Sequence, residues 1–287
     1  MTWFWLALGA ALCLATADLL SKRYFSDLSL PEVVMARLAG VAPTGAILLL
    51  VIPWPPLDRD FFVTVALALP VDLACTFLYV RAIQISPLAL TQPFLAVTPL
   101  FSALTGLAIL GEMPTLPGLG GLLLLAAGAY GLNLHLVRAG WLEPWRAIRR
   151  EKGSWIMLLV SVAYAYTSVM GRRAVLHSSP LFMGAVYPLL VGLGVALVLG
   201  LRGQLRWGWL RRPWPASAVA LCVGGEIICH FLALASVQTA YMLAVKRLSP
   251  LFAVLWGAWL LGEGRLGQHL LASALMAAGA AVVLIYG

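Results

Sequence analysis

Charged residues are scarce in this chain. Lys, Arg, Asp and Glu together make up 10% of its 287 residues, whereas hydrophobic residues make up 62%. Soluble domains usually carry about 25% charged residues, so this composition excludes an ordinary soluble domain. Apolar runs close to the roughly 20 residues that cross about 30 Å of hydrocarbon recur along almost the whole chain. We therefore predict a polytopic membrane protein.

The sequence also lacks the motifs of several enzyme classes. It contains no Asp-Asp-x-x-Asp prenyl-diphosphate motif, no Gly-x-Ser-x-Gly nucleophile motif and no His-Glu-x-x-His zinc motif. A Walker-type phosphate-binding loop is absent as well. We therefore expect neither an intramembrane enzyme nor direct use of ATP, and we expect no cofactor.

Cysteine is rare, and its placement argues against a disulfide framework. The four cysteines all fall inside apolar runs: Cys13, Cys75, Cys222 and Cys229. We expect reduced thiols that pack as small hydrophobic groups, not disulfides or a metal site.

A net charge of +8 is compatible with a nucleic-acid partner, but the basic residues lie mostly in short segments between apolar runs. Contact with anionic lipid headgroups and the signalling of membrane topology explain that distribution better. We therefore expect membrane lipid as a partner and no nucleic acid.

The apolar runs predict an all-α membrane protein with ten transmembrane helices. Helices are expected because lipid cannot satisfy free backbone groups, and these runs are too long and too apolar for barrel strands. The first run lacks a basic leader and a clear cleavage site, which favours a retained span. The predicted spans cover residues 3–23, 31–52, 61–83, 87–110, 115–138, 154–174, 180–201, 214–236, 238–261 and 265–286.

Two stretches indicate that the chain is a duplication. Thr98–Glu112 and Ser249–Glu263 align at an offset of 151, with eight of fifteen positions identical. The identical pairs are Pro99/Pro250, Leu100/Leu251, Phe101/Phe252, Leu104/Leu255, Gly106/Gly257, Leu110/Leu261, Gly111/Gly262 and Glu112/Glu263. The same offset pairs Ala126-Ala127-Gly128 with Ala277-Ala278-Gly279.

The predicted spans therefore form two five-helix repeats, residues 1–138 and 154–287, joined by a linker at 139–153. An odd number of spans per repeat places the copies in opposite orientations, as in many secondary transporters. An offset near 150 extends the repeat weakly to the start of each half, pairing Trp5 with Trp155, Asp18 with Ser168, Lys22-Arg23 with Arg172-Arg173, Ser29 with Ser179, and Arg37 with Tyr187.

At these residues the chain resembles the EamA branch of the drug/metabolite transporter superfamily. The two Pro-x-x-x-x-x-x-Gly-x-x-x-x-Gly-Glu segments, the Ala-Ala-Gly helices and the five-plus-five layout carry the resemblance, which covers essentially the whole chain. The resemblance implies a ten-helix secondary transporter with a cavity between its halves, in which helices 5 and 10 serve as packing supports. It does not imply a substrate, since members of the family carry amino acids, nucleotide-sugar-like metabolites, amines and drugs.

The loop charges predict an orientation in the cell inner membrane. One side carries three cations, Arg59, Arg172 and Arg173, and the other carries thirteen. The positive-inside rule therefore places the middle linker in the cytoplasm and both termini outside it. This orientation is the reverse of the one usual in the family that the chain resembles.

Three predicted spans carry charges near their centres: Asp72, Glu226 and the pair Lys246-Arg247. Each such charge costs about 2.5–3.5 kcal/mol or more at mid-depth and usually faces a cavity or a partner. One hypothesis is that the two acids converge on a cavity where they bind a cation or transfer protons. The alternative is a set of internal salt bridges that only locks the bundle.

His230 follows Glu226 by one helical turn, so the two side chains share a face. This spacing fits a proton relay, and it fits equally a core histidine that is satisfied by its neighbour. A metal site is not expected, because no third or fourth ligand is evident.

Two faces of helices 4 and 9 are candidate cavity walls under the resemblance. Helix 9 carries aromatic and small residues at steps of three or four, and helix 4 carries hydroxyls; the candidates among them are Thr98, Ser249 and Trp256. An aromatic wall suits an amine through cation–π contact, worth up to about 2 kcal/mol when desolvated. The alternative is an aromatic stripe that packs against neighbouring helices or lipid.

Asp18 and Arg37 are close enough in sequence to pair across a helical hairpin, as a structural ion pair or as a gate. The tyrosines Tyr79, Tyr164 and Tyr187 are candidates for cavity hydroxyls, with packing as the alternative. Among the prolines inside predicted spans, Pro99 and Pro250 are repeat equivalents, which favours paired hinges.

These observations predict a secondary transporter that moves a small polar organic solute by alternating access. Mixed charge at mid-depth indicates a zwitterion or an amine, such as an amino acid or a choline-like metabolite. Burial disfavours a charged carboxylate, so protonation of Asp72 or Glu226 is the expected coupling event. The alternative function is a flippase in which Lys246 and Arg247 hold the phosphate of a lipid-linked solute. Either a monomer or a homodimer fits the sequence.

Overall fold

The computed structural model describes residues 1–38, 41–86, 91, 94–131, 152–249, 251–252, 256 and 270–286. Every regular element within these residues is a helix. Six spans among them are long and apolar enough to cross a membrane: α1 (Thr2–Phe25), α2 (Leu30–Leu38) together with α3 (Val41–Val51), α4 (Arg59–Ile85), α9 (Lys152–Leu176), α10 (Pro180–Leu201) and α11 (Pro213–Leu234). The protein is therefore an all-α, multi-pass membrane protein.

The remaining described helices are shorter: α6 (Thr98–Leu110), α7 (Leu116–Gly131), the 3-10 helix η2 (Gly208–Arg211), α12 (Thr239–Lys246) and α14 (Leu270–Tyr286). They fall within the fourth, fifth, ninth and tenth predicted spans, except η2, which precedes α11. Parts of these four spans, and most of the predicted linker 139–153, lie outside the described residues. The count of ten crossings therefore stays a prediction.

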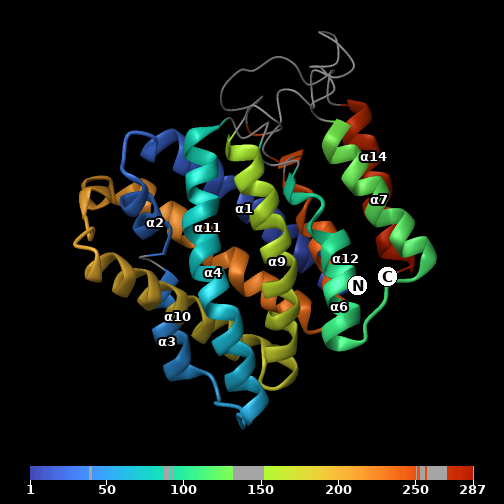
Figure 1. The fold of residues 1–287 in the computed structure, drawn as a ribbon, viewed down its shortest axis with the longest axis horizontal. Helices are drawn as coiled ribbons and strands as arrows, with labels where there is room; N and C mark the ends of the chain where they lie inside the picture. The colour runs from blue at the N-terminus through green and yellow to red at the C-terminus, as the bar shows by residue number, and fades with distance from the viewer. Residues whose placement is uncertain are drawn as a thin grey trace.

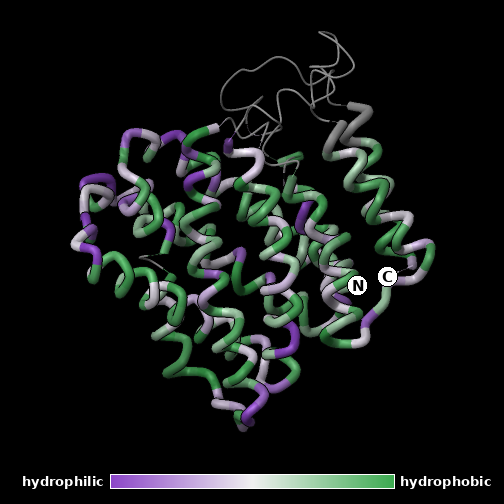
Figure 2. The backbone as a smooth tube through the Cα atoms, viewed as in Figure 1, coloured by the Kyte–Doolittle hydropathy of each residue, from purple (hydrophilic) through white to green (hydrophobic). Residues whose placement is uncertain are grey.

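The helices carry few polar residues along their length. Figure 2 shows them mostly in the hydrophobic colour, with the hydrophilic stretches mainly near helix ends and in loops. Large apolar side chains stay exposed on the outside, among them Leu50, Leu104, Leu123 and Leu197. Such a surface suits a hydrocarbon solvent better than water.

Equivalent helices of the two repeats run in opposite directions. Near the end of α1, Lys22 donates to the carbonyl oxygen of Ser86, which follows α4. Gly153, at the start of α9, also lies against Ser86, because a Cβ on Gly153 would be 2.5 Å from the Ser86 Oγ. The end of α1 and the beginning of α9 therefore share one face of the bundle, which we name the linker face. The opposite face, with the loops 52–58, 111–115, 177–179 and 235–238, is the terminus face.

The packing interleaves the two repeats (Figure 1). α1 packs most extensively on α11 and then on α12, both from the second repeat, and α9 packs in the same way on α4 and α6 from the first. α3 with α10, α6 with α12, and α7 with α14 complete this two-fold pattern. We name the first set the α1 group (α1, α11 and α12) and the second the α9 group (α9, α4 and α6).

Ion pairs outside the apolar spans hold each group together. In the α1 group, the two terminal nitrogens of Arg212 each lie 2.7 Å from an oxygen of Asp27, and this contact lowers the pKa of Asp27 below its ordinary value. In the α9 group, Asp58 caps α4 by accepting from the Phe61 amide at 2.9 Å, and it lies 2.7 Å from the ring of His177. These contacts lower the pKa of Asp58, the Phe61 amide contributing most.

Two helices are interrupted at equivalent positions. Ala96-Val97 and Arg247-Leu248 form turns within otherwise helical stretches, and the two turns are 151 residues apart. Pro99 lies in the first turn of α6, just after the first interruption, where a proline removes no helical hydrogen bond. Pro250, the other predicted hinge, lies outside the described residues. Broken helices at mid-depth expose backbone groups that a cavity or a ligand must satisfy.

α7 and α14 form a separate pair at the edge of the bundle (Figure 1). Small residues allow their backbones to approach: a Cβ on Gly279 would lie 2.8 Å from the carbonyl oxygen of Gly121 and 2.8 Å from the amide of Leu125.

Candidate functional site

A cavity of about 200 Å³ lies between the α1 group and the α9 group, roughly midway along the helices. Its lining combines five charged side chains with hydroxyls and aromatic rings. The polar and aromatic lining residues are Arg37, Asp72, Thr76, Tyr79, Tyr164, Thr167, Ser168, Tyr187, Glu226, His230, Phe231, Lys246 and Arg247.

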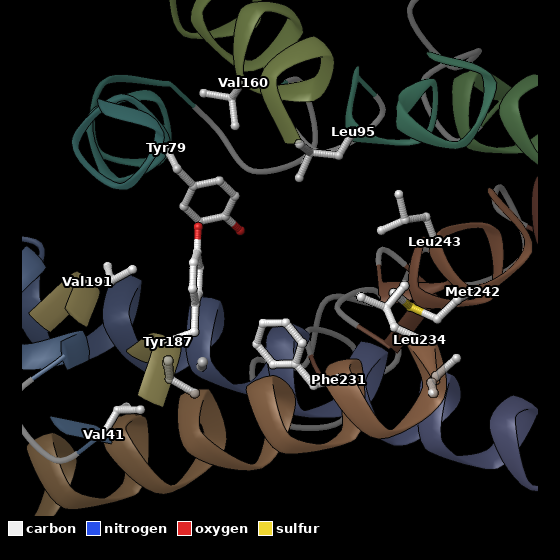
Figure 3. Packing of buried hydrophobic residues seen from close by; sticks show 14 of the residues in the cluster. Val41, Tyr79, Leu95, Val160, Tyr187, Val191, Phe231, Leu234, Met242 and Leu243 are labelled. Carbon is white, nitrogen blue, oxygen red and sulfur yellow. The ribbon is translucent and has the colours of Figure 1, made fainter. Parts of the chain in front are cut away.

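Aromatic rings form much of the cavity wall. Figure 3 shows the side chains of Tyr79, Tyr187 and Phe231 directed toward one central space from three different helices. The rings of Tyr187 and Phe231 meet edge to face with centroids 5.8 Å apart. The rings of Tyr79 and Tyr164 lie 6.2 Å apart. The wall therefore offers apolar ring surface together with tyrosine hydroxyl groups.

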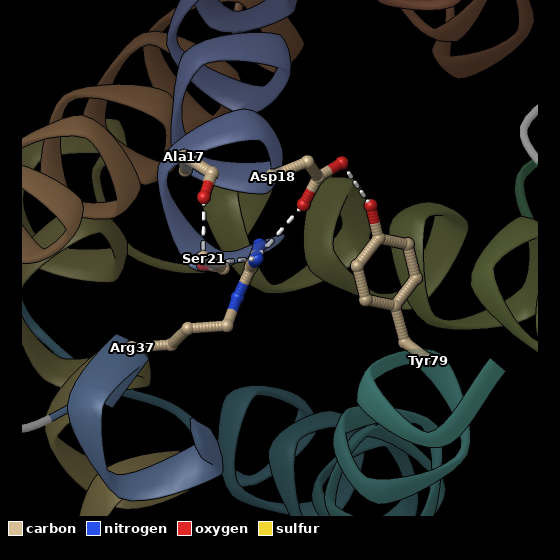
Figure 4. A network of polar contacts seen from close by, with 5 residues as sticks. All are labelled: Ala17, Asp18, Ser21, Arg37 and Tyr79. Atoms are coloured by element: carbon tan, nitrogen blue, oxygen red, sulfur yellow. Dashed lines mark hydrogen bonds and ion pairs between the residues drawn. The ribbon is translucent and has the colours of Figure 1, made fainter. Parts of the chain in front are cut away.

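The first charged cluster joins α1, α2 and α4 (Figure 4). Arg37 donates to Asp18 at 2.8 Å and to the hydroxyl of Ser21 at 3.2 Å. The other oxygen of Asp18 accepts from the Tyr79 hydroxyl at 2.5 Å. Arg37 and Tyr79 line the cavity, and Asp18 stands behind them. The charge of Arg37 is therefore neutralised within the protein.

The second charged cluster joins α11 and α12. The ammonium of Lys246 contacts the carboxylate of Glu226 and lies 2.9 Å from the Nδ1 of His230. The sequence left open which acid meets which base, and the geometry pairs Glu226 with Lys246. This pairing neutralises two more of the cavity charges.

Asp72, on α4, is not part of either cluster. Its carboxylate accepts hydrogen bonds from the hydroxyls of Tyr187 and Thr167. Among the described residues it has no ion-pair partner.

Arg247 follows α12 in the interrupted stretch and is buried, with 3% of its surface exposed. One terminal nitrogen donates to the hydroxyl of Thr98 at 3.2 Å, and that hydroxyl is 2.9 Å from Ser161. The Nε of Arg247 has no hydrogen-bond partner in the described part of the chain, and no carboxylate pairs with the guanidinium there. A buried, unneutralised guanidinium is costly unless an anion approaches it.

Among the described residues, two cavity charges of opposite sign thus remain without an ion-pair partner. Arg37 is neutralised by Asp18 and Lys246 by Glu226, which leaves Asp72 from the first repeat and Arg247 from the second. The arrangement suits a ligand that carries a cationic and an anionic group.

Three of the predicted wall residues do not line the cavity. Thr98 contributes only through its contact with Arg247, and neither Ser249 nor Trp256 belongs to the lining. Tyr241, on α12 in the ninth predicted span, is buried, and its hydroxyl accepts from the Thr115 amide at 2.8 Å near the start of α7. Among the described aromatic residues of the ninth predicted span, Tyr241 and Phe252 pack against the core of the bundle.

The site also contains residues that sequence reasoning missed. Thr76, Thr167, Gly171 and Phe231 line the cavity, yet such residues are too common in apolar helices to give a signal. Arg172, counted in the sequence only as a loop cation, is partly buried and lies 2.6 Å from Glu112. Among the described residues, no group of three or more His, Cys, Asp or Glu side chains is placed to hold a metal ion.

Comparison with known proteins decides the family. The sequence model of the EamA-like transporter family matches residues 1–134 and again residues 151–285. The chain belongs to the EamA-like transporter family. It is therefore a membrane transporter of the drug/metabolite transporter superfamily.

A solved structure shows that this fold is already known. The structure, titled "Crystal structure of protein", is 18% identical and superposes with a TM-score of 0.73. The match covers 100% of this chain and 99% of the other. No curated protein matches the chain.

Proposed function

We propose that this transporter moves a small zwitterionic solute, such as an amino acid, by alternating access. Arg247 binds the anionic group of the solute and Asp72 binds its cationic group. The observation that carries the proposal is the pair of unneutralised, opposite charges left in one cavity after the other cavity charges have paired. Charge-assisted hydrogen bonds of this kind are roughly twice as strong as neutral ones.

The size and the wall of the cavity support a small solute. Its volume of about 200 Å³ is below the range of about 300–1,000 Å³ that is typical of sites for drug-sized ligands. The rings of Tyr187 and Phe231 offer an apolar surface to the uncharged part of the solute.

The charge pattern favours a zwitterion over the two alternatives from the sequence. A simple amine would use Asp72 but would leave Arg247 buried without an anion. A flippase would need Lys246 and Arg247 together to hold a phosphate, but Lys246 is already paired with Glu226.

Proton coupling through Glu226, Lys246 and His230 belongs to the same proposal. A proton on Glu226 would remove the charge that holds Lys246, and Lys246 would then be free to interact with the solute or with His230. Glu226→Gln is therefore expected to abolish uptake driven by a pH gradient while solute exchange continues without one.

The orientation remains part of the proposal: the linker face is cytoplasmic and both termini lie outside. The excess of loop cations on the linker face supports it. A topology reporter fused after the last residue is expected to be active outside the cytoplasm, and a cytoplasmic signal would reverse the assignment.

Binding and uptake by purified protein in proteoliposomes test the proposed substrate class. Amino acids are screened first, and Asp72→Asn and Arg247→Gln are then compared with the wild type. Each variant is expected to weaken binding about 10- to 100-fold, because a hydrogen bond to a charged group contributes about 1.5–3 kcal/mol. Arg23→Gln is the control, because Arg23 is exposed and lies outside the cavity. Wild-type affinity in both cavity variants would disprove the assignment.

A further inference from the structure

Two basic side chains at repeat-equivalent positions make the same contact at opposite faces. Lys22, near the end of α1, donates to the carbonyl oxygens of Ile83 at 3.5 Å and Ser86 at 3.2 Å, where α4 ends. Arg172, near the end of α9, donates to the carbonyl oxygens of Leu234 and Val237, where α11 ends. We name these contacts the Lys22 clamp, at the linker face, and the Arg172 clamp, at the terminus face.

The acceptors repeat as closely as the donors do. Lys22 and Arg172 are 150 residues apart, and both acceptor pairs, Ile83 with Leu234 and Ser86 with Val237, are 151 apart. The last carbonyls of a helix lack partners within it and carry the negative end of its dipole, so a cation there is favoured. The duplication has therefore placed the same electrostatic clamp once at each face.

Each clamp crosses the boundary between the two groups that enclose the cavity. Lys22 belongs to the α1 group and donates to carbonyls at the end of α4, in the α9 group. Arg172 belongs to the α9 group and donates to carbonyls at the end of α11, in the α1 group. The ion pairs Asp27–Arg212 and Asp58–His177 stay within one group each. The clamps can therefore respond when the two groups separate at one face.

The Arg172 clamp lies directly beside the cavity. Gly171 and Phe231 both line the cavity, and a Cβ on Gly171 would be 3.3 Å from the Phe231 ring. Arg172 is the next residue after Gly171, and its acceptor Leu234 is one helical turn beyond Phe231. The Arg172 clamp therefore lies immediately on the terminus side of the cavity lining at Gly171 and Phe231.

Glu112 supports the Arg172 clamp from within its own group. It follows α6 and lies 2.6 Å from Arg172, so it holds the guanidinium in place without crossing to the α1 group. Lys22 has only its two carbonyl contacts among the described residues.

We propose that Lys22 and Arg172 are the paired gate residues of the transport cycle. Release of the Arg172 clamp, while the Lys22 clamp stays formed, opens the cavity to the terminus face. Release of the Lys22 clamp, while the Arg172 clamp stays formed, opens it to the linker face. This inference depends on the alternating access of the proposed function but not on the identity of the solute.

Sided chemical labelling tests the proposal. Ser168→Cys places a thiol in the cavity of a chain whose four native cysteines are replaced by Ala, and a membrane-impermeant thiol reagent is added to right-side-out or inside-out vesicles. The measured quantity is the ratio of labelling from the terminus face to labelling from the linker face, with Thr2→Cys marking the terminus face. Arg172→Gln is expected to raise this ratio several-fold, and Lys22→Gln is expected to lower it.

The adjacent basic residues provide matched controls. Arg23→Gln and Arg173→Gln remove a neighbouring charge at the same repeat offset. Arg173 forms an ion pair with Asp60 at 3.6 Å, and this pair stays within the α9 group. Both controls are expected to keep the wild-type ratio.

An unchanged ratio in both gate variants, or a shift in the same direction, would overturn the gate assignment. If Arg172→Gln does not fold, Arg172→Lys is used, for which a smaller rise is expected because one ammonium cannot reproduce the contacts of a guanidinium. If the labelling ratio shifts in opposite directions in Arg172→Gln and Lys22→Gln but the protein binds no zwitterion, the proposed solute is rejected and the gate assignment stands.

Discussion

Asp18, Ser21, Arg37 and Tyr79 show how a buried charge is made tolerable at the scale of single residues. The guanidinium and the carboxylate are both almost fully buried, and two hydroxyls supply further hydrogen bonds. Removing one member of such a pair leaves the other charge uncompensated. The sequence predicted that Asp18 and Arg37 are within reach of each other, but nothing in it indicated that Tyr79 completes the cluster.

Asp18→Asn is therefore expected to destabilise the protein by about 3–5 kcal/mol, the usual cost of breaking a buried ion pair from one side. Thermal unfolding in detergent measures the effect. Arg212→Gln breaks an exposed ion pair and serves as the control, with a much smaller change in Tm expected. An equal decrease in Tm in the two variants would contradict the conclusion that the buried Asp18–Arg37 pair contributes more to stability than the exposed Asp27–Arg212 pair.

The sequence identified the charged residues of the cavity but not their partners. Any side chain that is charged at mid-depth needs a partner, so Asp72, Glu226, Lys246 and Arg247 stood out. Which acid meets which base depends on the rotation and spacing of helices that are distant in the sequence. The same reason explains why nothing in the sequence indicated the contact between Arg172 and Glu112.

At the scale of the helices, close packing of α7 on α14 depends on two glycines. A methyl group on Gly279 would meet backbone atoms of Gly121 and Leu125 at 2.8 Å, and backbone cannot move aside as a side chain can. Gly120, one residue before Gly121, has open space around its missing Cβ.

Gly279→Ala is expected to lower the Tm, because the two helices must move apart. Gly120→Ala is the matched control and is expected to leave the Tm unchanged or raise it slightly, since Ala is favoured over Gly in a helix by about 0.5–1 kcal/mol. Thermal unfolding of the two variants side by side makes the comparison. If the Tm of Gly279→Ala equals that of Gly120→Ala, the close approach of the α7 and α14 backbones does not contribute to stability.

The positions of the helices were more predictable than their interruptions. Long apolar runs locate spans because the bilayer imposes their length. The prolines drew attention to Pro99 and Pro250, but the first interruption lies just upstream, at Ala96-Val97. A proline in the first turn of a helix is unstrained, so Pro99 marks the start of α6, and its role as a hinge stays a prediction.

At the scale of the whole molecule, the duplication predicted two similar halves but not how they pack. The resemblance implied a cavity between the two halves, which would most simply pack as two separate bodies. The helices instead exchange partners, since α1 packs on α11 and α9 packs on α4. The bodies that we expect to move are therefore the α1 group and the α9 group, each built from both repeats.

This packing also explains why the cavity charges come from both repeats. Asp72 belongs to the α9 group, whereas Arg247 directly follows the last helix of the α1 group. Under the proposed function, a zwitterion that bridges Asp72 and Arg247 would hold the two groups together in the loaded state. Removing either charge from the ligand would then remove its contact with one of these two residues.

The most direct test measures the affinity of one zwitterionic amino acid, its N-acetyl derivative and its methyl ester for the wild type, Asp72→Asn and Arg247→Gln. The account predicts that Asp72→Asn weakens the amino acid about 10-fold or more but leaves the N-acetyl derivative unaffected, because that ligand has no ammonium to lose. Arg247→Gln is expected to weaken the amino acid equally and to leave the methyl ester unaffected. The same fold loss for all three ligands in either variant would contradict the account.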